Sequence, residues 1–247
     1  MIRFNSLAAA LAVTLLPFAV AAETAQVAVA ANFAPTAEKL ADDYAKASGD
    51  KIEVIAGATG KLYAQVKSGA PFAAFLSADQ KTVDKMVDEG LADGKDRFTY
   101  ARGQLALWTS KTGADLSNPK KAIDAATHVA IANPELAPYG KAAAEVIEKL
   151  GLPADLGGKI VMGENIGQAQ TMVASGSADL GFVAASAVVG QTDGSVWLVP
   201  EDMHKPLLQD AALLTAGKDN TAAKGFLDFL RTDEARKLIG AAGYGTE

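Results

Sequence analysis

The hydrophobic positions of this chain follow two spacings that alternate along most of its length. Short apolar runs of strand type are each followed by a stretch in which apolar residues recur three and four positions apart, as on one face of a helix. Strands that alternate with helices predict an α/β fold with a parallel sheet and helices on its faces. The predicted strands lie at 27–31, 51–56, 72–76, 128–132, 159–162 and 179–183, and the predicted helices at 35–47, from 60, from 79, at 142–150 and from 164.

Two stretches depart from this alternation. Residues 98–108 form one β-prone run interrupted by Gly103, which is longer than an ordinary strand of about 5–6 residues. We expect this run to cross from one lobe to another. A strand at 207–214 would return to the first lobe, where helices at 221–230 and 232–241 close the chain.

The predicted architecture is therefore a pair of α/β lobes joined by two crossing strands. Residues 23–101 together with 206–247 would form lobe I, and residues 102–205 would form lobe II. In such folds, ligands bind at the carboxyl ends of the strands, so we expect a cleft between the lobes there.

The first 22 residues have the pattern of a secretory signal peptide. A positive start with Arg3 precedes an apolar run at 7–20, and Val20-Ala21-Ala22 places small residues at a cleavage site before Glu23. An uncleaved anchor is the alternative. The chain has no cysteine, which excludes a disulfide framework, a thiolate metal site and a lipidated cysteine. We expect a free periplasmic protein.

Charge and motifs narrow the class of function. The formal net charge is −6, or −7 once Arg3 is removed with the signal peptide, which argues against nucleic acid and anionic membrane as partners. An enzyme is the main alternative to a binding protein. However, the chain has only His128 and His204, no nucleophile elbow, no complete phosphate loop and no metal-ligand spacing. We therefore expect no enzymatic activity and no cofactor.

Four loops share one physical character. Each follows an apolar strand, opens a helix and is small or polar at the turn. Helix N-termini offer unpaired N–H donors and a partial positive charge of about half a unit. Four of them meeting across a cleft could hold a dianion without Lys or Arg; a protein that merely caps its helices well would show the same loops. The loops are Ala31-Asn32, Ala58-Thr59-Gly60, Pro138-Tyr139-Gly140 and Asn165-Ile166-Gly167.

A set of motifs then indicates a family. In order, they are Ala-Ala-Asn32-Phe, Gly57-Ala-Thr59-Gly-Lys-Leu-Tyr-Ala-Gln, Gly-Ala-Pro-Phe, Leu-Ser-Ala-Asp79, Arg97-Phe-Thr-Tyr-Ala, Ala132-Asn-Pro-Glu-Leu-Ala-Pro-Tyr139-Gly, Gly163-Glu-Asn-Ile166-Gly-Gln-Ala and Asp179-Leu-Gly-Phe-Val-Ala. Together they resemble the periplasmic molybdate-binding proteins of ABC importers over nearly the whole mature chain. The resemblance implies a type II periplasmic-binding-protein fold, a monomer that closes on tetrahedral molybdate or tungstate, and a membrane permease as partner.

The resemblance also assigns the ligand contacts. They fall on Ala31 and Asn32 in the first loop, on Thr59 in the second, and on the backbone N–H groups of Tyr139 and Ile166 in the other lobe.

Three departures from the family pattern, one alternative ligand and one nearby carboxylate qualify this assignment. Better-known members have Ser where Asn32 and Thr59 stand, and a Tyr where this chain has Ala184. Sulfate is the rival ligand, because it has the same charge and shape. Glu164, two residues before Ile166, must point away from a bound anion or be paired.

Overall fold

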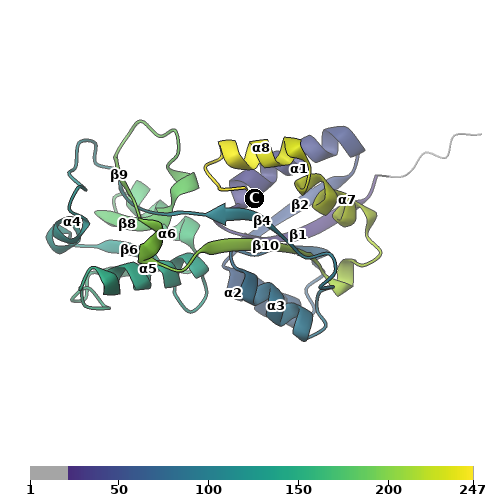
Figure 1. Cartoon of the computed structure of the whole chain (residues 1–247), viewed down its shortest axis with the longest axis horizontal. Helices are drawn as coiled ribbons and strands as arrows, with labels where there is room; N and C mark the ends of the chain where they lie inside the picture. Colours follow the sequence, from purple (N-terminus) through teal and green to yellow (C-terminus); the bar gives the residue numbers. More distant parts are fainter. Residues whose placement is uncertain (1–21, 247) are drawn as a thin grey trace, which may run out of the picture.

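The computed structural model describes residues 22–246, so the predicted signal peptide lies, except for its last residue, outside the described residues. The described chain forms two five-stranded mixed sheets, with strand orders β2-β1-β3-β10-β4 and β7-β6-β8-β5-β9. Each sheet forms one lobe, and the lobes lie end to end along the long axis (Figure 1). The predicted α/β architecture, two lobes joined by two crossing strands, is confirmed.

Lobe I is built around β1, which pairs in parallel with β2 and β3, while β10 runs antiparallel between β3 and β4. Helices α1, α7 and α8 cover one face of this sheet, and α2 and α3 cover the other (Figure 1). The elements are β1 (Thr24–Ala30), α1 (Ala34–Ser48), β2 (Lys51–Gly57), α2 (Thr59–Lys67), β3 (Ala74–Leu76), α3 (Gln80–Asp88), β4 (Phe98–Gly103), β10 (Leu207–Leu213), a 3-10 turn (Thr215–Gly217), α7 (Thr221–Leu230) and α8 (Asp233–Ala241).

Lobe II repeats this arrangement around β6, which pairs in parallel with β7 and β8. Antiparallel β5 and β9 complete the sheet, with α5 packed on one face and α6 on the other. The elements are β5 (Leu105–Thr109), α4 (Pro119–Ala125), β6 (Val129–Ala132), α5 (Pro138–Lys149), β7 (Ile160–Gly163), α6 (Ile166–Ala174), β8 (Leu180–Ala184), β9 (Ser195–Leu198) and two 3-10 turns (Ala185–Ala187 and Glu201–Met203).

The two crossings lie side by side. The long β-prone run divides into β4 and β5 at Gln104, and Gly103 still pairs with Leu207 of β10, two residues past the boundary expected at residue 101. A side chain at Gly103 would not fit, because a Cβ atom there would lie 2.1 Å from the Tyr139 hydroxyl oxygen and 2.6 Å from Gln209 Nε2. The glycine thus lets lobe II approach the crossing strands closely.

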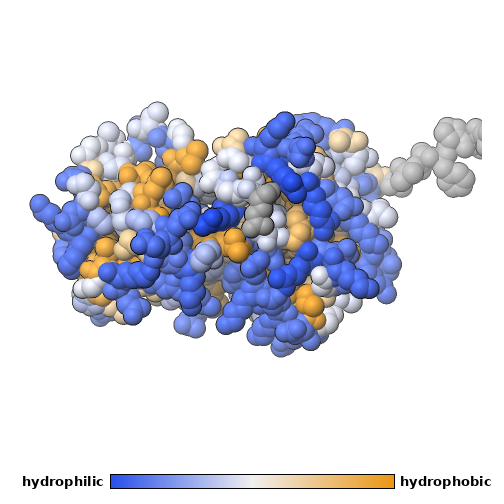
Figure 2. Space-filling model, viewed as in Figure 1, coloured by the Kyte–Doolittle hydropathy of each residue, from blue (hydrophilic) through white to orange (hydrophobic). Residues whose placement is uncertain are grey.

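A ligand site is expected at the carboxyl ends of the parallel strands. β1, β2, β6 and β7 each lead into a helix, namely α1, α2, α5 and α6 in that order. Their carboxyl ends carry the four loops that the sequence singled out. On the face shown in Figure 2, hydrophilic residues cover most of both lobes. Within residues 22–246, no helix is both long enough and apolar enough to cross a membrane.

Asp179 holds three segments of lobe II together. Its carboxylate accepts hydrogen bonds from the backbone N–H groups of Thr127 (2.8 Å) and His128 (3.1 Å) and pairs with the Lys111 ammonium at 2.8 Å. The hydrogen bond from Lys111, followed by those two N–H groups, lowers the pKa of Asp179 from 3.8 to about 2. The charged carboxylate therefore joins the starts of β6 and β8 to the end of β5.

We predict that Asp179→Asn lowers the free energy of unfolding at pH 7 by about 1–2 kcal/mol, allowing for partial solvent screening. Because the folded-state pKa lies below the unfolded value, the stabilisation is present above about pH 4 and disappears as the pH falls towards 2. Urea unfolding of both proteins at several pH values measures this difference. Asp193→Asn is the control, because Asp193 is exposed and makes no ion pair within residues 22–246. A difference that stays constant with pH would contradict the assignment.

Candidate oxyanion site

The structure brings the five predicted site residues together around one small cavity between the lobes. Ala31, Asn32 and Thr59 line it from lobe I, and Tyr139 and Ile166 line it from lobe II. Its volume is about 10 Å³. A cavity needs roughly 10–15 Å³ of this kind to hold one water, so the closed lobes leave room for a small compact ligand only.

Backbone N–H groups supply most of the donors at this cavity. Thr59 and Ile166 are the first residues of α2 and α6, and Tyr139 is the second residue of α5, so helix geometry provides no acceptor for their N–H groups. Within residues 22–246, neither these three N–H groups nor that of Asn32 donates a hydrogen bond. Ala31 differs, because its N–H donates to the Gly57 carbonyl at 2.9 Å. Ala31 therefore contributes to the wall of the cavity.

The Thr59 hydroxyl adds a further donor. Thr59 is only 2% exposed, and its Oγ1 accepts a hydrogen bond from the backbone N–H of Ala78 at 3.3 Å. A hydroxyl has one hydrogen and two lone pairs, so accepting from Ala78 leaves the Thr59 hydrogen available to a ligand. Thr59 can thus offer both an N–H and an O–H.

Within the described residues 22–246, no charged side chain lines the cavity. An ion pair between the lobes joins Lys61 of α2, two residues after Thr59, to Glu164 of lobe II, with the ammonium 2.9 Å from the carboxylate. Glu164 lies two residues before Ile166, so it had to be paired or to point away from a bound anion. The ion pair with Lys61 meets the first of these conditions. The start of α2 also contacts a second loop of lobe II, because the Gly60 N–H donates to the carbonyl of Leu136, in the loop before α5, at 2.8 Å.

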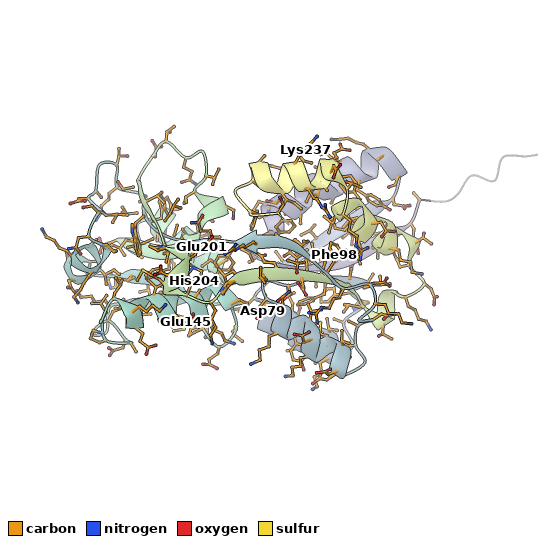
Figure 3. The ribbon with its side chains drawn as sticks, in the orientation of Figure 1. Asp79, Phe98, Glu145, Glu201, His204 and Lys237 are labelled. Atoms are coloured by element: carbon orange, nitrogen blue, oxygen red, sulfur yellow. The ribbon has the colours of Figure 1, made fainter. Side chains whose placement is uncertain are left out.

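A separate group of ionisable residues lies beside the crossing strands and does not line the cavity. Figure 3 shows Glu145, Glu201 and His204 together beside this crossing. Glu201 pairs with Arg102, and Glu145 accepts a hydrogen bond from the Lys205 N–H at 2.7 Å. Among residues 22–246, no group of three or more Asp, Glu or His side chains could hold a metal ion. Any anion at the cavity would therefore meet dipoles rather than cations.

The Tyr139 side chain points away from the cavity. Its hydroxyl oxygen accepts a hydrogen bond from Gln209 Nε2 at 3.3 Å, and Tyr139 is 1% exposed. Burial, with smaller effects of neighbouring groups, raises the pKa of Tyr139 well above its usual range, so the hydroxyl stays protonated. Only the backbone N–H of Tyr139 is left to serve a ligand.

The Asn32 side chain is held by residues that the sequence did not single out. Its Nδ2 donates to Gln209 Oε1 at 2.8 Å and lies 3.4 Å from the Tyr244 hydroxyl oxygen. Tyr244 in turn donates to the Asn32 carbonyl at 2.6 Å. Gln209 and Tyr244 are both buried. One sequence signal existed, because a Gln inside the apolar stretch 207–214 is unusual for a buried strand.

The Ala184 position borders a second cavity of about 200 Å³, which Asn32 and Ile166 also line. Ala184 ends β8 and is 2% exposed. Its methyl group leaves space where better-known relatives are expected to place a tyrosine. The hydroxyl of Tyr244 from lobe I reaches this region, where it accepts a hydrogen bond from Ser186 Oγ at 2.9 Å.

The Lys61–Glu164 pair leads to a prediction about the charge near the cavity. Lys61→Ala leaves Glu164 unpaired beside an anion, so the Kd for molybdate should rise about 2–5-fold, the effect of an exposed pair worth up to about 1 kcal/mol. Asn32→Ala should weaken binding more than Lys61→Ala does. Isothermal titration calorimetry at low salt measures both changes.

The double variant Lys61→Ala/Glu164→Ala is the control, because it removes both charges. Its affinity should return to within about 2-fold of the unmodified protein, as expected for a neutral pair replacing an exposed ion pair. A loss in Lys61→Ala that exceeds the loss in Asn32→Ala would show that the lysine itself binds the anion.

Comparisons with known proteins agree with this geometry. The chain is 44% identical to the molybdate-binding protein ModA of Azotobacter vinelandii over 98% of each chain. It is also 44% identical to ModA of Rhodobacter capsulatus, over 89% of this chain and 87% of that one. The solved structure of the Azotobacter vinelandii periplasmic molybdate-binding protein superposes with a TM-score of 0.85 at 37% identity, covering 90% of this chain and 99% of that chain.

These matches confirm the resemblance drawn from the motifs, and they confirm that the chain is a binding component rather than an enzyme. A model of the family described as bacterial extracellular solute-binding protein matches residues 25–245, nearly all of the described chain. The chain therefore belongs to the bacterial extracellular solute-binding proteins.

Proposed function

We propose that this protein binds a tetrahedral molybdate or tungstate dianion in the cavity between its lobes and delivers it to the membrane permease of an ABC importer. The observation that carries the proposal is a set of four backbone N–H groups, from Asn32, Thr59, Tyr139 and Ile166, which have no acceptor within residues 22–246. They surround a cavity that no charged side chain of this part of the chain lines. The molybdate-binding relatives, at 44% identity, support the same ligand class.

The donor count agrees with useful affinity. Hydrogen bonds to a charged group contribute roughly 1.5–3 kcal/mol each. Four N–H groups and the Thr59 hydroxyl would then supply on the order of 8–15 kcal/mol before the costs of ordering and desolvation. Micromolar binding requires about 8 kcal/mol, which lies at the lower end of this range.

The chemistry of the donors also defines the ligand's protonation state. An N–H group can donate but cannot accept, so an acid hydroxyl on the ligand would face another donor. The cavity therefore favours a fully ionised oxyanion. Sulfate meets this criterion too, and only the longer metal–oxygen bonds of molybdate and tungstate distinguish them by size.

The setting of this function is the periplasm. Residues 1–22 have the pattern of a cleavable signal peptide, and a related structure is that of a periplasmic protein. We expect the mature protein to act as a monomer, because a carrier that closes on one ion needs no second copy for its site. Lobe I and lobe II both supply donors from this single chain.

A thermal-shift panel on the mature protein, residues 23–247, tests the proposal. Molybdate and tungstate should each raise the Tm, because a ligand that binds only the folded state stabilises it by RT ln(1 + [L]/Kd), or about 2.7 kcal/mol at 100 Kd. Sulfate at the same concentration should raise the Tm much less. Chloride at matched ionic strength is the control for salt effects.

Each other outcome has a definite meaning. Equal shifts with sulfate and molybdate would overturn the assignment of the ligand, and no shift with any oxyanion would overturn the ligand class. Thr59→Val then removes the hydroxyl donor, together with the acceptor of the Ala78 N–H, while retaining the backbone N–H of Thr59. It should weaken molybdate binding by about 10-fold or more, the loss of one charge-assisted hydrogen bond.

A further inference from the structure

A buried amide lies directly behind the cavity and touches both lobes. Gln209 belongs to the crossing strand β10 and is 0% exposed. Its Oε1 lies 2.8 Å from Asn32 Nδ2 and 3.0 Å from the Tyr100 hydroxyl oxygen. Its Nε2 lies 3.3 Å from the hydroxyl oxygen of Tyr139 in lobe II. One side chain thus contacts two of the proposed ligand-binding residues and a tyrosine of strand β4.

The hydrogens in this network do not match the acceptors. A tyrosine hydroxyl has one hydrogen. The Tyr100 hydroxyl lies 3.0 Å from two acceptors, the Ser77 carbonyl and Gln209 Oε1, and one hydrogen cannot serve both well. The Tyr139 hydroxyl receives a hydrogen from Gln209, but its own hydrogen has no acceptor within residues 22–246. Tyr100 therefore has an acceptor too many, and Tyr139 has an unused donor.

A half-turn of the Gln209 amide removes both mismatches. The turn exchanges the oxygen and nitrogen positions without moving the other heavy atoms. Tyr139 would then donate to the Gln209 oxygen, and the Gln209 NH2 would donate to Tyr100, whose single hydrogen serves Ser77. The Gln209 NH2 would also face Asn32, so the Asn32 amide must turn as well and present its oxygen to Gln209. That oxygen would lie 3.4 Å from the Tyr244 hydroxyl, whose hydrogen stays on the nearer Asn32 carbonyl at 2.6 Å, so this longer contact is given up.

The paired turn changes what Asn32 offers to a ligand. Asn32 lines the cavity, and the end of its amide that faces away from Gln209 has no hydrogen-bond partner within residues 22–246. Before the turn that end is an oxygen, which would repel an oxyanion. After the turn it is an NH2 group, which would donate to one.

We propose that Gln209 is a positioning residue for oxyanion binding, which fixes the orientation of the Asn32 amide so that the Asn32 NH2 group is held towards the bound anion. The proposal rests on the function proposed above. Gln209 does not touch the ligand itself. It acts through Asn32, and the hydroxyls of Tyr100 and Tyr139 fix its orientation.

A purely structural role is the competing explanation. Gln209 would then only satisfy buried hydroxyls at the crossing, and its loss would lower stability without acting through Asn32. The two explanations differ in how substitutions combine. Substitutions that act through one another are not additive, whereas independent ones multiply in their effect on Kd.

A double-mutant cycle on the mature protein separates them. The variants are Gln209→Met, which keeps the length but removes the amide, Asn32→Ala, and the two combined. Molybdate Kd is measured by isothermal titration calorimetry, and Tm is measured alongside. We expect each single change to weaken binding at least 10-fold, and the double variant to lie within 2-fold of Asn32→Ala. Fold-changes that multiply would overturn the proposal.

Gln80→Met provides a matched control. The Gln80 amide donates to Thr99 and to Asp210, the neighbour of Gln209 on β10, at 3.1 Å each, and it makes no hydrogen bond to Asn32. This change should lower the Tm and leave the molybdate Kd within 2-fold. An equal loss of affinity in Gln80→Met would show that general loosening of the crossing is sufficient, which would also overturn the proposal.

A measurement on the unmodified protein covers the case in which Gln209→Met does not fold. In ¹⁵N–¹H spectra, molybdate should shift the side-chain NH2 resonances of Asn32 and Gln209 together. Shifts in the backbone N–H groups of the cavity, with the Gln209 NH2 unchanged, would overturn the proposal while leaving the function intact. No shift and no heat of binding at all would instead contradict the proposed function.

Discussion

The closed arrangement of this protein depends on backbone N–H groups that helix geometry leaves without acceptors. Four of them meet between the lobes, where little water can reach them. A buried donor without a partner costs about 1–3 kcal/mol. Closing the lobes over an empty cavity would incur that cost several times, whereas closing over an anion satisfies every donor. Under the proposed function, the same groups would both recognise the ligand and couple its binding to closure.

The proposed site suggests how an acidic protein could bind a dianion. The net charge of −6 gives no long-range attraction, and Lys61 and Glu164, which flank residues of the cavity, form an ion pair in which their charges cancel. Recognition must therefore come from fixed dipoles at short range, where charge-assisted hydrogen bonds are strong. A lysine or arginine at the centre would bind more anions, including many of the wrong size. Fixed donors make the fit depend on the position of each oxygen.

Local patterns were enough to predict the fold and the loops in which helices begin. Strand and helix spacing placed α1 within one residue of its observed ends, because periodicity is a property of neighbouring residues. The N–H donors followed from where helices begin. In contrast, β9 and α4 were not predicted, because their short segments carry little periodic signal.

The network around Gln209 could not be predicted, for a different reason. Gln209 and Asn32 are 177 positions apart, and they meet only because β10 crosses back beside β1's loop. A sequence shows that Asn32 carries an amide, but which end of that amide faces the cavity depends on partners contributed by both lobes. The orientation of a side chain is thus a property of the assembled crossing, and local spacing holds no information about it.

A cavity built from backbone donors also limits what side chains can change. Substituting Asn32, Thr59 or Ala184 alters hydroxyls, amides and free volume but leaves every N–H group in place. Relatives can therefore differ at these three positions and keep the same ligand class. The side chains then adjust affinity and selectivity, and Asn32 has the largest scope to do so, because its amide can present either a donor or an acceptor. In the proposal made above, control over that choice lies with the crossing strands, which also join the lobes, so residues that join the lobes would help to define the ligand.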